Sequence, residues 1–158
     1  MGPVYFPAPA RVTRWAGAFG YSRSMTSLAP LDCVLSLLPA IEAGGGAEDI
    51  SPYLAEDYTL SEAPHLLAPA GATRNREQAL AGAAAAHEVV SGQRFEVRRT
   101  TCEGTRVVLE AEWTATLLMD LPHWDTGEVI RARVAAVFEV RDGRIVSQDS
   151  YDCYFTPD

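Results

Sequence analysis

Alternating apolar and polar residues dominate the last third of the chain and predict long β-strands there. Residues 107–119 place apolar side chains on one face and Glu or Thr on the other, and residues 129–140 repeat this pattern. A shorter strand is expected at 95–101. Charged residues at the outward positions, such as Glu112 and Arg131, are expected to pair across neighbouring strands.

A last strand is expected to end at Tyr154, in the run QDSYDCY. Asp142-Gly143 separates it from the strand before, and Asp-Gly between alternating runs is a strong signal for a two-residue hairpin. The strands from residue 95 onwards therefore form an antiparallel meander. The closing strand mixes acids with tyrosines, which stability alone does not require, so it suggests the wall of a pocket.

Helical periodicity appears in the first half of the chain, where apolar residues recur three or four positions apart. The expected elements are a helix at 31–43, a short helix at 48–55, a strand at 58–63, a loop at 64–73 and a helix at 76–91 capped by Thr73 or Asn75.

This order of elements predicts an α+β fold, because helices precede and cover a run of antiparallel strands. We expect a cone-shaped α+β barrel in which a strongly curved antiparallel sheet wraps over three N-terminal helices. Small inward residues leave room for the covering helices or for a ligand; they are Ala111, Ala115, Ala132 and Ala136.

Length and composition fit one domain with one sizeable core, since the chain has 158 residues, of which 47% are hydrophobic and 22% charged. Residues 1–26 carry prolines, arginines and scattered aromatics without a sustained period. They are expected to form an N-terminal arm that is flexible or docks on the pocket or on a second subunit. Residues 27–158 form the predicted domain.

The net charge of −8 disfavours broad attraction to nucleic acid or to an anionic membrane. The chain contains no Lys, which excludes a Schiff-base lysine and a phosphate-loop lysine. Its cysteines lack the spacing of a zinc site, and no apolar run approaches the ~20 residues of a membrane span. We expect a cytoplasmic protein that uses no metal and no cofactor.

Asp149 is the main candidate for a general base. Under strict alternation it shares a face with Ile145 and Tyr151, so it points into the cone if Ile145 does. A carboxylate in an apolar pocket has a raised pKa and can abstract a proton near neutral pH. The alternative is a buried acid that is hydrogen-bonded to a tyrosine or a backbone amide. A β-bulge would invert the parity and favour Asp152 instead.

Glu62 and His65 follow one another at the end of the first strand, from which either can reach the pocket mouth. A histidine titrates near neutral pH and suits proton transfer. The alternative roles are an edge-strand carboxylate for Glu62 and a surface-loop histidine for His65.

Aromatic and small inward residues are the candidates for ligand binding, because aromatics offer flat apolar surface and a Tyr hydroxyl can hold a carbonyl oxygen. For Trp113 the simpler role is core packing. The ligand-binding candidates are Tyr58, Trp113, Ala115 and Phe138, and Tyr151 joins the catalytic candidates.

Four phrases follow one another along about residues 31–156: YLAEDYTL, GATRNREQALAG, EAEWTATLLMD and VFEVRDGRIVSQDSYD. In this order they resemble the SnoaL-like branch of the nuclear transport factor 2 superfamily. The resemblance implies the cone-shaped fold and a homodimer formed through the outer sheet face. It does not single out a reaction, because the fold hosts cyclases, isomerases, dehydratases, epoxide hydrolases and binding domains.

The closing phrase SQDSYD also resembles that of limonene epoxide hydrolases, which places Asp149 at their general-base aspartate. Those enzymes carry an Arg-x-Asp pair on the long strand, where this chain has Trp113 and Ala115. Epoxide opening by the same machinery is therefore not expected.

Two further chemistries of the superfamily are compatible with this chain. Ketosteroid isomerases carry a proton-shuttling Asp on the first strand, at a position that corresponds to Glu62 or Ala63 here. SnoaL-type polyketide cyclases use an Asp on a late strand with a nearby His, and Asp149 and His65 would take these roles.

The resemblance thus implies a cofactor-independent cyclase, isomerase or dehydratase that acts on an apolar, carbonyl-bearing metabolite, such as a polyketide or terpenoid of secondary metabolism. Asp149 would remove a proton α to the carbonyl, while a Tyr or His donor stabilises the enolate. A non-catalytic small-molecule-binding or dimerisation domain is the second hypothesis. It predicts a narrow pocket, or one without two convergent titratable groups.

Overall fold

The computed structural model describes residues 28–156, so the predicted arm at 1–26 lies outside the described residues. Its helices are α1 (Pro30–Glu42), α2 (Ala47–Ile50), the 3₁₀ turn η1 (Ser51–Tyr53) and α3 (Arg76–Val89). Its strands are β1 (Leu54–Glu62), β2 (Ala72–Asn75), β3 (Val90–Glu103), β4 (Arg106–Leu117), β5 (Val129–Arg141) and β6 (Arg144–Tyr154). In this part of the chain, no helix combines the length and the apolar character needed to span a membrane.

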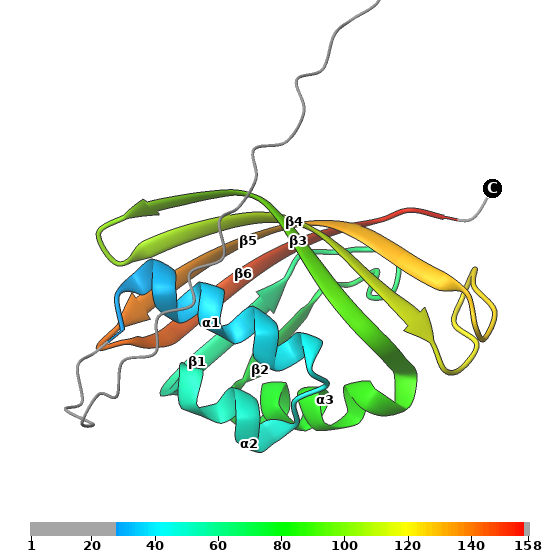
Figure 1. Cartoon of the computed structure of the whole chain (residues 1–158), viewed down its shortest axis with the longest axis horizontal. Helices are drawn as coiled ribbons and strands as arrows, with labels where there is room; N and C mark the ends of the chain where they lie inside the picture. Colours follow the sequence, from blue (N-terminus) through cyan, green and yellow to red (C-terminus); the bar gives the residue numbers. More distant parts are fainter. Residues whose placement is uncertain (1–27, 157–158) are drawn as a thin grey trace, which may run out of the picture.

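The strands form one curved sheet in the order β2-β1-β6-β5-β4-β3, and the helices lie against its concave face (Figure 1). This confirms the predicted α+β architecture with one correction. The sheet is mixed rather than antiparallel throughout, because β1 pairs with β6 in parallel. Strand β2 occupies part of the predicted loop. It was not predicted because its four residues are too few to show an alternating pattern.

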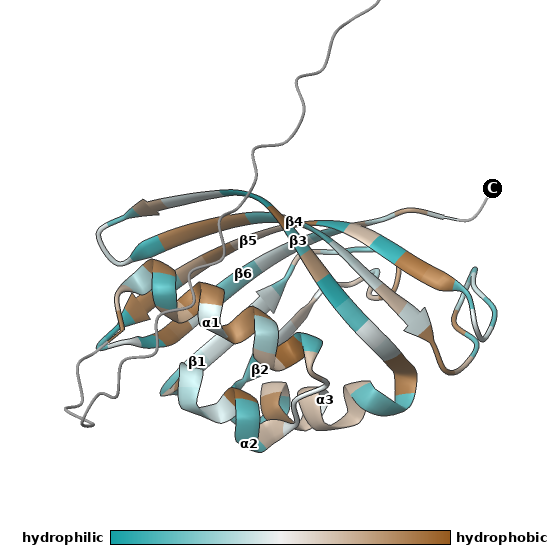
Figure 2. Ribbon diagram, viewed as in Figure 1, coloured by the Kyte–Doolittle hydropathy of each residue, from teal (hydrophilic) through white to brown (hydrophobic). Residues whose placement is uncertain are grey.

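The main core lies between α1 and the sheet. Val34 and Leu37 of α1 are buried against inward residues of the strands, among them Leu109, Phe138 and Ile145. Figure 2 shows the corresponding alternation of hydrophobic and hydrophilic residues along the strands. The inward positions predicted for β4 up to Leu117 and for β5 are therefore confirmed, whereas Met119, which was also expected to face inward, lies beyond β4 and is 47% exposed.

The predicted hairpin between β5 and β6 is confirmed by its backbone. Asp142 and Gly143 have φ angles of 53° and 73°, as a two-residue turn of this kind requires, and Arg141 pairs with Arg144. Both residues tolerate the left-handed region, Gly because it lacks a Cβ and Asp because its side chain can bond locally.

A β-bulge follows this hairpin and determines which side chains of β6 face inward. Val140 pairs with Ile145 and Glu139 with Ser147, so Val146 is an extra residue in β6. Ile145 is fully buried before the bulge, and Ser150 is 6% exposed beyond it. Residues of even number therefore point into the cone after the bulge.

Helix α3 begins with a capping box, in which the Asn75 side chain accepts a hydrogen bond from the Gln78 N–H and the Gln78 side chain accepts one from the Asn75 N–H. This confirms Asn75 as the cap. The middle of the helix contains Gly82, and a Cβ added there would meet no heavy atom within 4 Å.

Gly82→Ala should stabilise the fold, because Gly in a helix interior costs about 0.5–1 kcal/mol relative to Ala. Urea unfolding measures the gain. Gly45→Ala is the matched control with the opposite sign, since its Cβ would lie 2.5 Å from the Ala40 carbonyl oxygen. A loss of stability in Gly82→Ala would contradict this placement of the helix.

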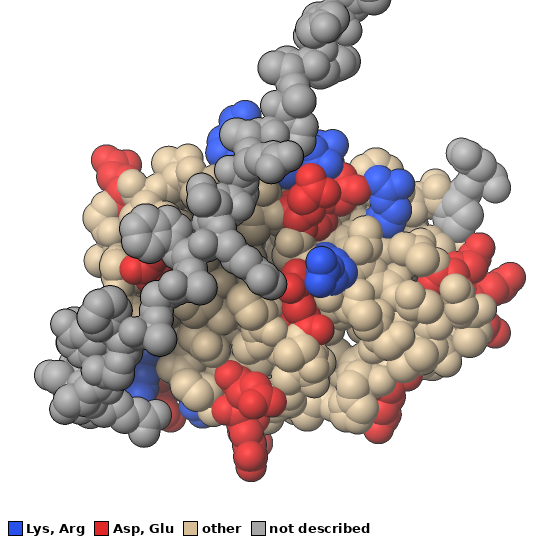
Figure 3. Space-filling model, viewed as in Figure 1, with Lys and Arg blue, Asp and Glu red and all other residues tan. Residues whose placement is uncertain are grey.

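The outer face of the sheet carries an ion cluster centred on Glu112, which lies on β4. Arg98 and Arg131 each donate to its carboxylate at 2.7 Å, and the Arg133 guanidinium lies 3.5 Å away. Figure 3 shows basic and acidic side chains next to one another over the strands. The predicted pairing of Glu112 with Arg131 across neighbouring strands is confirmed.

Glu112→Gln should make the fold less sensitive to acid. Hydrogen bonds from Arg131 and Arg98 lower the pKa of Glu112 from 4.5 to about 2, so its stabilising effect is complete above pH 4.5 and disappears as the pH falls towards 2. We expect the wild-type melting temperature to fall more steeply than that of the variant over this interval. Glu110→Gln is the control, because the Glu110 side chain is 48% exposed and its carboxylate Oε1 lies 3.8 Å from the Arg99 guanidinium, so this ion pair is weak. Equal slopes for both variants and the wild type would contradict the assignment.

Candidate functional site

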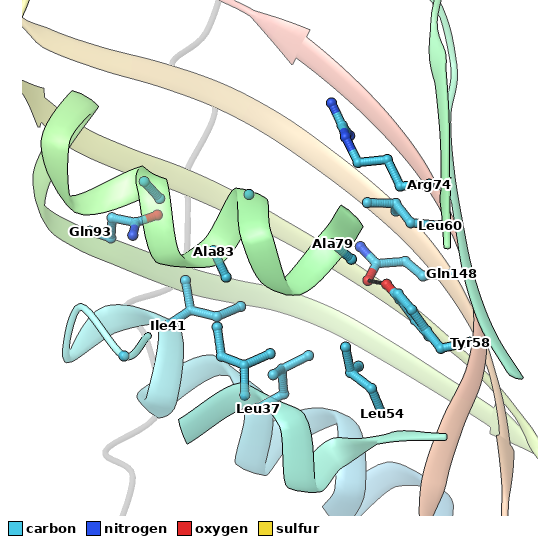
Figure 4. Close-up of a pocket in the computed structure, with 14 residues that line it drawn as sticks. Leu37, Ile41, Leu54, Tyr58, Leu60, Arg74, Ala79, Ala83, Gln93 and Gln148 are labelled. Carbon is cyan, nitrogen blue, oxygen red and sulfur yellow. Dashed lines mark hydrogen bonds between the residues drawn. The ribbon is translucent and has the colours of Figure 1, made fainter. Parts of the chain in front are cut away.

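Two adjoining chambers lie on the concave side of the sheet, the large one between the sheet and the helices. The large chamber has a volume of about 380 Å³ and is lined by α1, α2, β1 and α3, with Arg74 of β2, Gln93 and Gln148 as its long polar side chains (Figure 4). The small chamber has a volume of about 190 Å³ and lies over strands β1 and β3–β6. Leu60 and Gln148 line both.

Strands β1 and β6 bring the polar side chains to the small chamber. Leu60 pairs with Gln148 and Glu62 with Ser150 in the parallel ladder, so alternate residues of both strands line one continuous wall. The wall ends in a polar group that contains Glu62, Ser150, Asp152 and Tyr154.

Three titratable side chains converge at this polar end. Glu62, His65 and Asp152 each offer one ligand-type atom, and these atoms all lie within 4.8 Å of one another. Strand β1 supplies Glu62, the loop behind it supplies His65, and β6 supplies Asp152. Glu62 and His65 were candidates on sequence grounds, and Asp152 was the alternative to Asp149; the structure brings these three together.

The two carboxylates have different surroundings. Arg74 of β2 forms an ion pair with Glu62, so that carboxylate is already engaged by a guanidinium. Asp152 accepts a hydrogen bond from the Ser150 hydroxyl at 2.8 Å, and within residues 28–156 no arginine forms an ion pair with it. Asp152 is therefore the carboxylate that is available to a ligand in the small chamber.

The loop after β1 fixes the tautomer of His65. A turn closed by reciprocal backbone hydrogen bonds between His65 and Ala68 lets the Leu67 N–H donate to His65 Nδ1 at 3.2 Å. Since Nδ1 accepts, the proton of the neutral ring sits on Nε2. That Nε2 is buried and has no hydrogen-bond partner among the described residues. His65 itself lines neither chamber, but it lies beside Glu62 and Asp152 at the polar end of the small one.

Tyr154 packs between these groups and a second hydrophobic cluster, which is separate from the main core and consists of Ala115, Leu117, Trp124 and Ile130. Its ring lies 5.3 Å from the His65 ring and contacts Trp113 and Trp124 edge-on at 6.4 and 6.1 Å. Burial, with a smaller effect from the Asp152 charge, raises the pKa of Tyr154 to about 12. The hydroxyl therefore stays protonated at neutral pH and can donate a hydrogen bond.

Glu62, His65 and Asp152 are also the residue types that bind metal ions. However, a metal-binding His needs a lone pair towards the ion and a donor N–H towards its second partner. In His65 the Leu67 N–H uses the Nδ1 lone pair and leaves Nε2 protonated, while Arg74 neutralises Glu62. This donor set suits proton transfer better than metal coordination.

The inward placement predicted for Asp149 and Tyr151 is wrong. Both follow the bulge at Val146 and point away from the cone; Asp149 is exposed and Tyr151 is 52% exposed. The alternative that a bulge would turn Asp152 inward is the arrangement observed.

The four predicted ligand-binding residues fall into two groups. Tyr58 lines the large chamber and Trp113 lines the small one. Ala115 and Phe138 are 2% and 3% exposed, but they belong to the hydrophobic core and line neither chamber. Burial alone did not distinguish a packed position from one that faces a cavity.

Sequence reasoning missed several residues of the site, namely Arg74, Gln148, Ser150 and Tyr154. Three of them share the parity of Asp152 on β6, so one correct placement of the bulge would have found them together. Arg74 lies on the unpredicted strand β2.

Comparison with family models identifies a SnoaL-like domain over residues 37–148, which is more than half of the chain. No functionally curated protein matches the sequence in a corresponding search.

Solved structures extend the comparison. IdmH of Streptomyces antibioticus, a proposed polyketide cyclase, is 21% identical over 78% of this chain and 91% of its own, with a TM-score of 0.65. An LEH-like epoxide hydrolase of M. tuberculosis is 17% identical over 78% and 81%, with a TM-score of 0.62. A protein of Catenulispora acidiphila with a ketosteroid isomerase-like fold, solved with trimethylamine, is 18% identical over 79% and 85%, with a TM-score of 0.61. The chain therefore belongs to the SnoaL-like domain family and has the nuclear transport factor 2-like fold.

Proposed function

We propose that this chain is a cofactor-independent acid–base enzyme that acts on an apolar, carbonyl-bearing metabolite. The observation that carries the proposal is that Asp152 and Tyr154 line the polar end of the small chamber, with His65 beside them, and that this chamber adjoins the more apolar large one. A carboxylate beside two hydrogen-bond donors is the arrangement that enolate chemistry needs.

The side chains would divide the chemistry as follows. Asp152 removes a proton from the carbon next to the carbonyl, and the electron pair of the broken C–H bond moves onto the carbonyl oxygen. His65 Nε2–H and the Tyr154 hydroxyl donate hydrogen bonds to this oxyanion. Arg74 is paired with Glu62, which leaves Asp152 as the carboxylate that acts as the base.

The enolate is an intermediate common to three outcomes. Return of the proton to a different carbon isomerises the substrate, attack on a second carbonyl closes a ring, and loss of a β-hydroxyl group dehydrates it. Similarity to a proposed polyketide cyclase supports a polyketide or related substrate. Epoxide hydrolysis has less support, because Trp113 and Ala115 stand where limonene epoxide hydrolases carry their Arg-x-Asp pair.

A small-molecule-binding domain without catalysis is the second candidate, since similarity to the trimethylamine complex fits ligand binding alone. Incubation with nonan-2-one in D₂O separates the two functions, because an enzyme of the proposed type exchanges the protons α to the carbonyl. We expect NMR to show exchange well above the buffer rate. Binding of the ketone with exchange at the buffer rate would identify a binding domain.

A further inference from the structure

We infer that the ligand is an elongated amphiphile, with a carbonyl head in the small chamber and a longer apolar body in the large chamber. The chemical identity of the head rests on the proposed function. The two-chamber placement rests on the cavity itself and can be tested without turnover.

Polarity changes along β1 and β6. Inward residues of β1 run from Tyr58 through Leu60 to Glu62, and those of β6 run from Gln148 to Asp152. The strands are parallel, so both become more polar in the same direction, from the large chamber towards the small one. A ligand that follows this wall must be polar at one end.

Side chains form the boundary between the two chambers. The Tyr58 hydroxyl donates to Gln148 Oε1 at 3.1 Å, and Trp113 Nε1 donates to Gln93 Oε1 at 3.2 Å. Figure 4 shows the Gln148 amide turned towards Tyr58 at the edge of the large chamber. Tyr58 and Gln93 line the large chamber, Trp113 lines the small chamber, and Gln148 lines both. Each hydrogen bond therefore lies where the two chambers meet. For one ligand to occupy both chambers, rotation of these side chains must join them.

The volumes of the two chambers also favour an elongated ligand. Ligand sites commonly measure about 300–1,000 Å³. The small chamber, at about 190 Å³, holds a head group alone, whereas the large chamber adds about 380 Å³ of mainly apolar space. Its wall on α3 consists of Ala79, Gly82, Ala83 and Ala86, which leave this space unfilled.

Ala83→Leu tests the inference, because it adds a larger side chain to the α3 wall of the large chamber. Ala85→Leu is the matched control, since Ala85 is exposed on the same helix and lines neither chamber. Isothermal titration calorimetry with pentan-2-one and nonan-2-one measures binding to the wild type and to both variants. The two probes share one head and differ by four methylene groups.

In the wild type we expect nonan-2-one to bind at least about tenfold more tightly than pentan-2-one, because each buried methylene strengthens binding by up to about fourfold. Ala83→Leu should reduce this advantage to about threefold or less, with pentan-2-one affected by less than about twofold. Ala85→Leu should keep the wild-type values. The advantage should also persist in Asp152→Asn, where the proposed chemistry is lost.

Three results overturn the inference. One is equal affinity of the wild type for the two ketones, which includes undetectable binding of both. The second is a chain-length advantage that Ala83→Leu leaves intact, and the third is an equal loss in Ala85→Leu. None of these depends on catalysis, so failure of the two-chamber inference is distinguishable from failure of the proposed function.

Discussion

Asp152→Asn should slow the exchange of the α-protons of nonan-2-one by about 10²- to 10⁴-fold, the usual contribution of a general base. The amide keeps the size of the carboxylate and can still accept from the Ser150 hydroxyl, but it cannot take a proton. The fold should remain, because Asp152 forms no ion pair within the described residues. NMR exchange rates in D₂O, with melting temperatures measured in parallel, check this result.

Asp149→Asn is the control on the same strand. It makes the same chemical change three residues away, at an exposed position beyond the bulge. We expect its exchange rate to match the wild type. Loss of exchange in Asp149→Asn with full exchange in Asp152→Asn would show that β6 has the opposite parity in solution.

His65→Phe should lower the exchange rate by about 10²- to 10³-fold, the range seen when one donor to a developing oxyanion is removed. Phenylalanine keeps a ring against Tyr154, which the His65 ring contacts at 5.3 Å, but it removes the buried Nε2–H. The effect should fall on the maximal rate more than on the apparent affinity for the ketone, because the hydrogen bond strengthens as charge develops on the oxygen.

His65→Gln distinguishes this role from a structural one, since its amide N–H₂ can reach the place of Nε2–H. We expect it to recover part of the rate that His65→Phe loses. His87→Phe, at an exposed position on α3, should leave the rate unchanged. Equal rates for His65→Phe and the wild type would remove His65 from the mechanism.

Most of the fold could be predicted from periodicity. The alternation in β4 and β5 is long enough to determine both the strands and their inward faces, and Asp142-Gly143 determines the turn that joins β5 to β6. The parallel pairing of β1 with β6 was not predictable in this way, because the pattern along a strand carries no information about the direction of its neighbour.

The candidate site was predictable only in part, because β6 carries acids at both parities. Asp149 and Asp152 differ by an odd number of positions, so strict alternation places one inside and the other outside. The extra residue Val146 reversed the choice, and no local signal as clear as Asp-Gly marks that bulge. Glu62 and His65 were found because they lie at the end of the first predicted strand, from which either side chain can reach the mouth of a pocket.

Trp113 shows a second limit. Its position on the inward face of β4 was predictable, but its contact with the small chamber depends on Ala132 and Tyr154 leaving space beside it. Phe138 also faces inward, on β5, but it is packed in the core and only 3% exposed. Whether an inward residue meets a cavity depends on the volumes of neighbours from distant segments, which the pattern of one strand does not specify.

In the proposed mechanism, the inward face of β6 presents Asp152 to a carbonyl group held by His65 and Tyr154. A crystal structure of the Asp152→Asn variant with nonan-2-one tests it most directly. We predict that the ketone oxygen lies within hydrogen-bond distance of His65 Nε2 or the Tyr154 hydroxyl, with the α-carbon against residue 152. A ketone oxygen that points into the large chamber, away from both donors, would contradict this mechanism.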